Sequence, residues 1–178
     1  MRPPDVHRIV VRPLPDAWRF KEERKMDVYK RIEELGYTLP SAAPKGGIYK
    51  PVKQVGDLLY ISGQGATRNG EPAVWGKLGS DRTIEEGQEA ARICTLNALS
   101  AVHSYLGDLN KIKSVVKILA FVASAPGFDR QPKVVDGASK LLMDIFGEDR
   151  GVGARSAIAA NELPGNISVE IEYIFEIE

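Results

Sequence analysis

Two charged residues near the C-terminus have the side-chain types that acid-base chemistry on an anionic molecule requires. Arg155 opens a segment of small residues just before an apolar strand, where a guanidinium group could reach a cleft. Two parallel N–H···O bonds make arginine a preferred partner for a planar carboxylate. Glu170 lies in the strand that follows, and its carboxyl oxygen could handle a proton.

These two residues meet in one cleft if the chain around Ala157 and the chain around Val169 form neighbouring antiparallel strands. Arg155 would then hold an anionic substrate, and Glu170 would position or activate water. The alternative is a structural one, in which the two residues form a salt bridge or remain separate surface charges.

Several common signatures of nucleotide binding, acyl transfer and zinc binding are absent from the sequence. The sequence has no phosphate-binding loop, no Gly-x-Ser-x-Gly elbow and no His-Glu-x-x-His pattern. The single cysteine, Cys94, excludes an intramolecular disulfide and a multi-cysteine metal site, and it fits a reducing compartment. The one further feature is a corner at Ser62 and Gly63, which we expect at the end of a strand.

Length and charge place the chain in the class of globular domains. Its 178 residues suit one domain, and 24 basic against 24 acidic residues leave a net charge of zero. A neutral chain lacks the global field that attracts nucleic acid, so a nucleic-acid partner is not expected. No apolar run approaches the roughly 20 residues needed to cross a bilayer, and we expect a cytoplasmic protein.

Residues 1–25 are rich in charge and proline and lack a helical period, which predicts a loosely ordered N-terminal extension before a domain at 26–178. Organelle targeting by this segment is a weaker alternative, because Asp5, Asp16, Glu22 and Glu23 are unusual in a transit peptide.

Helical periods occur at three places. A short helix is expected from Met26 to Gly36, and a second helix ends at Gly147 after a stripe of apolar residues that begins at Val134. The clearest signal is the capping box at Thr83-Ile84-Glu85-Glu86, which predicts a helix that continues to Gly107. On that helix we expect Cys94 to pack in the core and His103 to be a partly buried structural residue.

Strand patterns occupy the remaining segments. The composition of residues 58–62 predicts a short β-strand that ends at Gly63. The pair Asn69-Gly70 predicts a tight turn. The segment 114–123 has apolar residues at both odd and even positions, which predicts a strand covered on both faces. We expect two helices to cover one face and another subunit to cover the other. The alternation over 167–177 predicts a half-buried strand, and the order of elements indicates an α+β layer sandwich.

Four motifs in order carry a family resemblance: Ser62-Gly63-Gln64, Ala154-Arg155-Ser156, Leu163-Pro164 and Val169-Glu170-Ile171-Glu172. With these motifs the segment from about Tyr49 to Glu178 closely resembles the RidA family, also called YjgF or endoribonuclease L-PSP. The segments 81–102 and 131–137 are most similar to its longer, YjgF-like branch.

The resemblance implies a chorismate-mutase-like fold, in which a mixed β-sheet is backed by two helices, and a homotrimer with clefts between subunits. It implies hydrolysis of reactive enamines and imines, such as 2-aminoacrylate, to 2-keto acids and ammonia without a metal or cofactor. By matching motif positions, Arg155 would hold the substrate carboxylate and Glu170 would orient water or donate a proton. Tyr49, Ser62 and Gly63 would line the cleft, and Ala157, which stands where relatives often have cysteine, would contribute only backbone groups.

Two other functions stay open. The family name suggests a ribonuclease or translation inhibitor, against which the balanced charge and the lack of a histidine pair weigh. The second alternative is a trimer that binds a small carboxylate without turning it over. Arg155 does not distinguish this function from catalysis, because it would hold the carboxylate in both.

Overall fold

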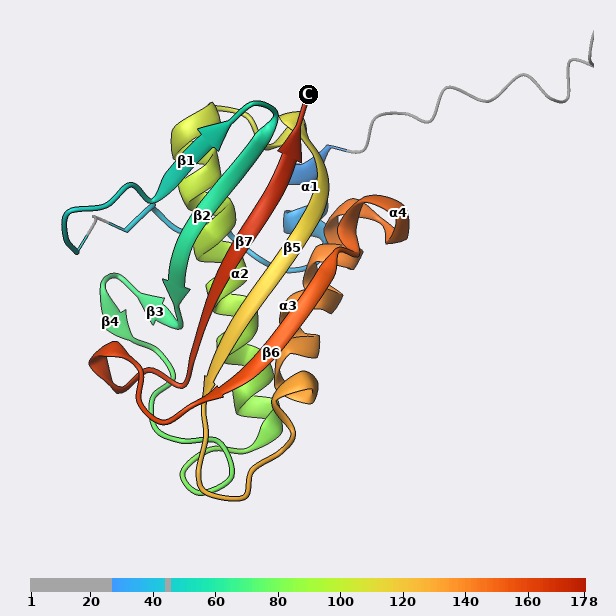
Figure 1. Cartoon of the computed structure of the whole chain (residues 1–178). Helices are drawn as coiled ribbons and strands as arrows, with labels where there is room; N and C mark the ends of the chain where they lie inside the picture. Colours follow the sequence, from blue (N-terminus) through green and yellow to red (C-terminus); the bar gives the residue numbers. More distant parts are fainter. Residues whose placement is uncertain (1–26, 44–45) are drawn as a thin grey trace, which may run out of the picture.

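A five-stranded sheet with two long helices packed on one of its faces forms most of the structure (Figure 1). The computed structural model describes residues 27–43 and 46–178, so the extension predicted at 1–25 lies outside the described residues. In chain order the elements are α1 (Val28–Glu34), β1 (Val52–Val55), β2 (Leu58–Gly65), β3 (Thr67–Arg68), β4 (Glu71–Pro72), α2 (Ile84–Leu106), β5 (Ile112–Ala123), α3 (Gln131–Phe146), α4 (Glu148–Gly151), β6 (Ala154–Ala160) and β7 (Val169–Ile177).

The strand order in the sheet is β1-β2-β7-β5-β6. The strand β7 is antiparallel to both of its neighbours, whereas β5 and β6 are parallel, so the sheet is mixed. In Figure 1 the sheet faces the viewer and α2 and α3 lie behind it. The expectation of an α+β fold with a mixed sheet backed by two helices is confirmed.

The strand order overturns one local expectation. Ala157 in β6 pairs with Ala120 of β5, and Val169 in β7 pairs with Val122 of β5. The prediction that the chain segments around Ala157 and Val169 are neighbouring antiparallel strands is therefore wrong, because β5 lies between them. A parallel pair needs a crossover connection, and α3 with α4 supplies it between β5 and β6.

A second correction concerns Gly63, which does not end a strand. The strand β2 continues to Gly65, and a register shift between Ile61 and Gln64 accommodates the segment that we expected to be a corner. A bulge of this kind re-aims side chains without ending the hydrogen-bonded ladder.

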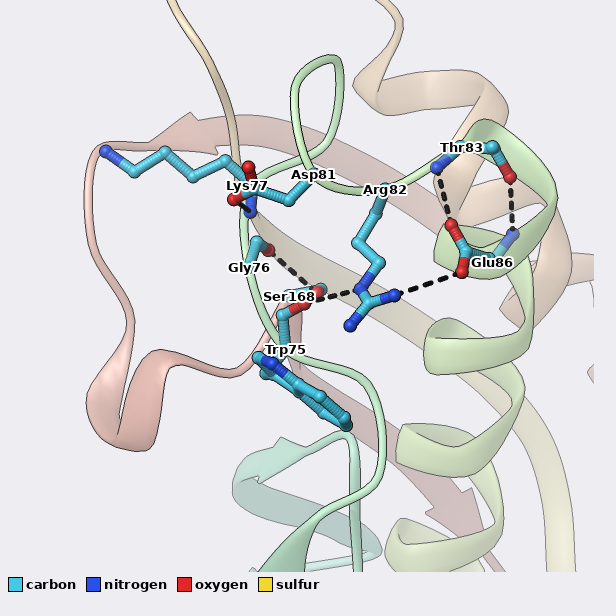
Figure 2. Close-up of polar contacts among 8 residues, drawn as sticks. All are labelled: Trp75, Gly76, Lys77, Asp81, Arg82, Thr83, Glu86 and Ser168. Atoms are coloured by element: carbon cyan, nitrogen blue, oxygen red, sulfur yellow. Dashed lines mark hydrogen bonds and ion pairs between the residues drawn. The ribbon is translucent and has the colours of Figure 1, made fainter.

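The helix α2 begins as the capping box predicts. The Thr83 hydroxyl accepts the Glu86 amide at 3.3 Å, and the Glu86 carboxylate accepts the Thr83 amide at 2.8 Å (Figure 2). The helix ends at Gly107, whose φ of 76° lies in the left-handed region. Cys94 is buried on this helix, and the ring of His103 is partly buried and hydrogen-bonds the Tyr29 hydroxyl at 2.8 Å, so both structural expectations are confirmed.

The loop before α2 is tied to the start of β7. Figure 2 shows Arg82 between Trp75 and Glu86: its Nε donates to the Trp75 carbonyl at 2.6 Å and its Nη1 pairs with Glu86 at 3.2 Å. The buried Ser168 hydroxyl donates to the Gly76 carbonyl at 2.8 Å. These bonds fix the backbone one residue before β7 begins.

The strand β7 alternates between the two faces of the sheet. Its odd-numbered residues are buried on the helix side, where the Tyr173 hydroxyl meets Thr95 of α2 at 3.0 Å. Glu170, Glu172 and Ile174 occupy the opposite face, which no helix of the described chain covers. The predicted half-buried strand is confirmed, and we call its uncovered side the open face. In the described residues no helix has the length and apolar character that a membrane span needs.

The two long helices approach each other closely at Gly137 of α3. A Cβ atom at this position would overlap the carbonyl oxygen of Gln88 in α2 and would lie 2.8 Å from its Cα. Only glycine allows the two helix backbones to come this near.

Gly137→Ala is expected to destabilise the fold, although alanine is normally the better helix former by roughly 1 kcal/mol. The overlap with α2 should lower the free energy of unfolding by about 2 kcal/mol. Urea unfolding measures the change, and Gly46→Ala is the matched control because no atom lies within 4 Å of the added methyl group. A stabilised Gly137→Ala variant would contradict the close approach.

Candidate active site

Glu170 lies on the open face of the sheet, with its carboxyl group against Gly63 of β2. A Cβ atom on Gly63 would collide with the Glu170 carboxyl group, whose Cδ would be 2.8 Å away. The glycine therefore leaves the space that the Glu170 side chain occupies. This contact brings together two of the residues that the motifs single out.

The neighbours of Glu170 make its surroundings apolar. Phe121 of β5 lies directly opposite Glu170, and Ile158 of β6 lies opposite Phe121. Burial raises the pKa of Glu170, and the negative charge of Glu172 raises it further. A carboxyl group held in this way keeps its proton to a higher pH than an exposed glutamate.

Tyr49 and Ser62 line two different hollows near Gly63. Tyr49 lines a shallow hollow together with Gly63 and Gln64, and its hydroxyl accepts the Gly46 amide at 3.2 Å. The Ser62 hydroxyl donates to the Lys50 carbonyl at 2.7 Å, and Ser62 lines a separate hollow on the open face. The segment from Ser62 to Gln64 thus separates two hollows and touches Glu170.

Arg155 lies elsewhere, on the edge strand β6, and points toward α3. Its Nη1 donates to the Asp136 carboxylate at 2.9 Å and to the Ser139 hydroxyl at 3.0 Å. Within the described residues, no hydrogen bond engages its Nε or Nη2. That pair of nitrogens forms one side of the guanidinium fork, which suits bidentate binding of a carboxylate.

In a single chain, Arg155 and Glu170 do not share a cleft. Arg155 is level with Ile118 and Tyr173, which are buried on the helix side, whereas Glu170 is on the open face. Ala157 accompanies Arg155 and packs against the core. The structure therefore places Gly63 against Glu170 and Arg155 with Ala157 on β6. Tyr49 lines a hollow with Gly63 that Ala101 and Ser104 of α2 also line, and Glu170 is not part of that hollow.

Sequence reasoning missed the two residues of α3 that hold Arg155. Asp136 and Ser139 are three residues apart, a spacing that puts polar side chains on one helix face. That spacing was visible in the sequence, but nothing local showed that Arg155 would pack against it. In the described part of the chain, no three His, Cys, Asp or Glu side chains are grouped as metal ligands would be.

Comparison with known proteins shows relatives that match most of the chain. The chain is 38% identical to protein TCP17 of Trypanosoma cruzi over 84% of its own length and 94% of that protein. It superposes on the crystal structure of Atu1372, a protein of unknown function from Agrobacterium tumefaciens, with a TM-score of 0.79 and 44% identity, covering 85% of this chain and 92% of that one. A structure from Shewanella oneidensis, titled a "putative endoribonuclease", gives a TM-score of 0.81 and 32% identity, covering 85% and 99% of the two chains.

The family model described as "YjgF/chorismate_mutase-like, putative endoribonuclease" matches residues 29–177, nearly all of the described chain. The match includes both strands that carry Arg155 and Glu170, and it agrees with the resemblance expected from the four motifs. The chain belongs to the YjgF/chorismate mutase-like family.

Proposed function

We propose that this protein hydrolyses reactive imines and enamines of 2-amino acids to 2-keto acids and ammonia, in clefts between the protomers of a homotrimer. The observation that carries the proposal is the pair of complementary groups described above. Arg155 has a positioned guanidinium whose Nε and Nη2 make no hydrogen bond within the described residues, and Glu170 has a carboxyl group with a raised pKa.

Arg155 is suited to hold the substrate carboxylate. Its bonds to Asp136 and Ser139 use Nη1 and fix the plane of the group, which leaves Nε and Nη2 for the ligand. The side chain is 26% exposed, so a ligand can reach it. An anchored carboxylate places the adjacent imine carbon at a defined distance from the groups that handle protons.

Glu170 is suited to move the protons. In its protonated form it donates to the imine nitrogen as the oxygen of water bonds to the imine carbon, and the resulting carboxylate takes a proton from that water. The carbinolamine then collapses: Glu170 donates a second proton to its nitrogen, the C–N bond breaks and ammonia leaves. The Glu170 carboxylate takes the hydroxyl proton as the carbonyl group forms, so the acid is regenerated. A raised pKa lets this carboxyl group donate a proton at a higher pH than an exposed glutamate can, and it makes the resulting carboxylate a stronger base.

In this proposal, Arg155 and Glu170 of one cleft come from two different protomers. One chain keeps Arg155 and Glu170 on opposite faces of its sheet, so the two groups act together only if Arg155 reaches the open face of another copy. The open face supports such packing at its β6 edge, where the apolar side chain of Ile158 is 47% exposed. Tyr49, Ser62, Gly63 and the backbone at Ala157 would line the shared cleft.

Removal of Arg155 tests the reaction. The purified protein should accelerate 2-keto acid release from 2-iminopropionate generated in situ, and Arg155→Ala should lower kcat/KM by about 100-fold, the loss of one bidentate charged contact. Arg68→Ala, which removes an exposed arginine with 68% side-chain exposure, is the control. Failure to accelerate hydrolysis of several amino-acid-derived imines would reject the proposal. Keto acid binding without turnover would instead favour a carboxylate-binding protein.

Mixing two inactive variants tests whether the cleft is shared. Arg155→Ala and Glu170→Gln should each lose activity, and co-refolding equal amounts should restore it in part. In a trimer each mixed assembly holds one complete cleft, so random mixing should recover about one quarter of the parent activity. No recovery, with mixed assemblies verified by two affinity tags, would mean that the two residues do not act across a subunit boundary.

The raised pKa of Glu170 predicts how stability depends on pH. The folded chain binds this proton more tightly than the unfolded chain, so ionisation of Glu170 costs stability as the pH rises above its ordinary pKa of 4.5. Glu170→Gln should therefore raise the free energy of unfolding relative to the parent at about pH 7, and this gain should shrink as the pH falls toward 4.5 and be lost below it. Chemical unfolding across this pH range measures the difference. Glu71→Gln controls for the loss of one exposed negative charge, and a gain from Glu170→Gln that does not vary with pH would contradict the assignment.

A further inference from the structure

A hollow of about 460 Å³ on the open face is lined by three lysines, Lys50, Lys53 and Lys117, and by one carboxylate, that of Glu172. Its lysines come from three segments that the fold brings together: Lys50 precedes β1, Lys53 is in β1, and Lys117 is in β5. The apolar side chains of Tyr60, Leu119 and Ile174 complete the lining.

The register of the sheet explains this gathering of lysines. Lys53 is opposite Tyr60, Tyr60 is opposite Ile174, and Ile174 is opposite Lys117. The two lysines thus stand about 14 Å apart at the backbone, three strand spacings, with apolar side chains between them. Flexible lysine side chains can reach inward over that distance toward one anion.

Within the described chain the three lysines of the hollow outnumber its one carboxylate, that of Glu172, so the hollow keeps an excess of positive charge. Among residues 27–43 and 46–178, no ion pair engages Lys50, Lys53 or Lys117, and the Nζ of Lys117 donates to the Ser156 hydroxyl at 2.9 Å. By contrast Lys77, Lys113 and Lys140 have carboxylate oxygens at 3.0, 2.5 and 2.8 Å. An organic anion with a short carbon chain complements a hollow that is both apolar and cationic.

The hollow adjoins the proposed catalytic position. Ser62 lines it, and the next residue, Gly63, lies against the Glu170 carboxyl group. Glu172 of the hollow follows Glu170 on the same strand face, at a spacing of about 7 Å. A four- or five-carbon substrate with its imine carbon beside Glu170 could extend a second carboxylate to the lysines.

We propose that the lysine-lined hollow binds the side-chain carboxylate of the substrate, so that the protein prefers imines of dicarboxylic amino acids to imines of neutral ones. This inference rests on the proposed function and specifies its substrate class. The reaction balance is unchanged: one imine and one water give one 2-keto acid and one ammonia.

The experiment compares imines of aspartate or glutamate with 2-iminopropionate, each generated in situ. The parent should show a kcat/KM at least about tenfold higher for the dicarboxylic imine, and Lys53→Met or Lys117→Met should remove this preference while changing kcat/KM for 2-iminopropionate less than about twofold. Lys111→Met, outside the hollow, is the matched control because it removes an exposed lysine charge and keeps the stem. Equal kcat/KM for the two imine classes in the parent would overturn the inference while the proposed function stands.

Calorimetry separates the two proposals if no imine is hydrolysed. The parent should bind 2-oxoglutarate about tenfold more tightly than pyruvate, and Lys53→Met should abolish the difference. Such a preference in binding would support a dicarboxylate site in the hollow, while the absence of imine hydrolysis would reject the proposed hydrolase activity. Equal affinity for the two keto acids would overturn the inference, as expected if a second copy of the chain fills the hollow. The unfolding transition of each variant confirms that loss of binding is not loss of fold.

Discussion

The alternation of β7 between the two faces of the sheet is the constraint on which the rest of the structure depends. This strand is hydrogen-bonded on both sides, to β2 and to β5, and its odd-numbered side chains form the centre of the core. A slip of one residue would bury Glu170 under the helices and expose Tyr173 to solvent. Burial of the apolar side chains therefore also sets the face on which Glu170 and Glu172 lie. The bond from Ser168 to Gly76, in the loop before α2, fixes where the strand begins.

The position and direction of the edge strand β6 are set by its connection to β5. Because it follows β5 through a helical crossover, it is parallel to β5 and lies outside it rather than beside β7. This position keeps one side of the guanidinium of Arg155 bound to α3 and the other side unengaged within the described chain. The same position separates Arg155 from Glu170 by a strand and by the thickness of the sheet. Because the fold puts Arg155 and Glu170 on opposite faces of the sheet, the proposed site is complete only when several chains assemble.

The open face gives its two neighbouring glutamates different surroundings. Glu170 is level with Phe121, and burial raises its pKa. Glu172 is level with Leu119 and lines the hollow that Lys117 and Lys53 also line. The open face thus combines a carboxyl group whose pKa is raised with a hollow lined by lysines, and the proposed proton transfer to an anionic substrate depends on both.

The sequence by itself determined the local features and the family. The capping box at Thr83, the helix end at Gly107 and the alternation over 167–177 each depend on contacts between residues close in the chain, so they could be predicted. The motifs around Ser62, Arg155 and Glu170 identified the relatives. Only the tertiary structure decided that β5 separates Ala157 from Val169, that Asp136 and Ser139 hold Arg155, and that three lysines share one hollow. These features follow from strand order and register, which are set by pairing between distant segments and by burial of the whole core, and no local period encodes them.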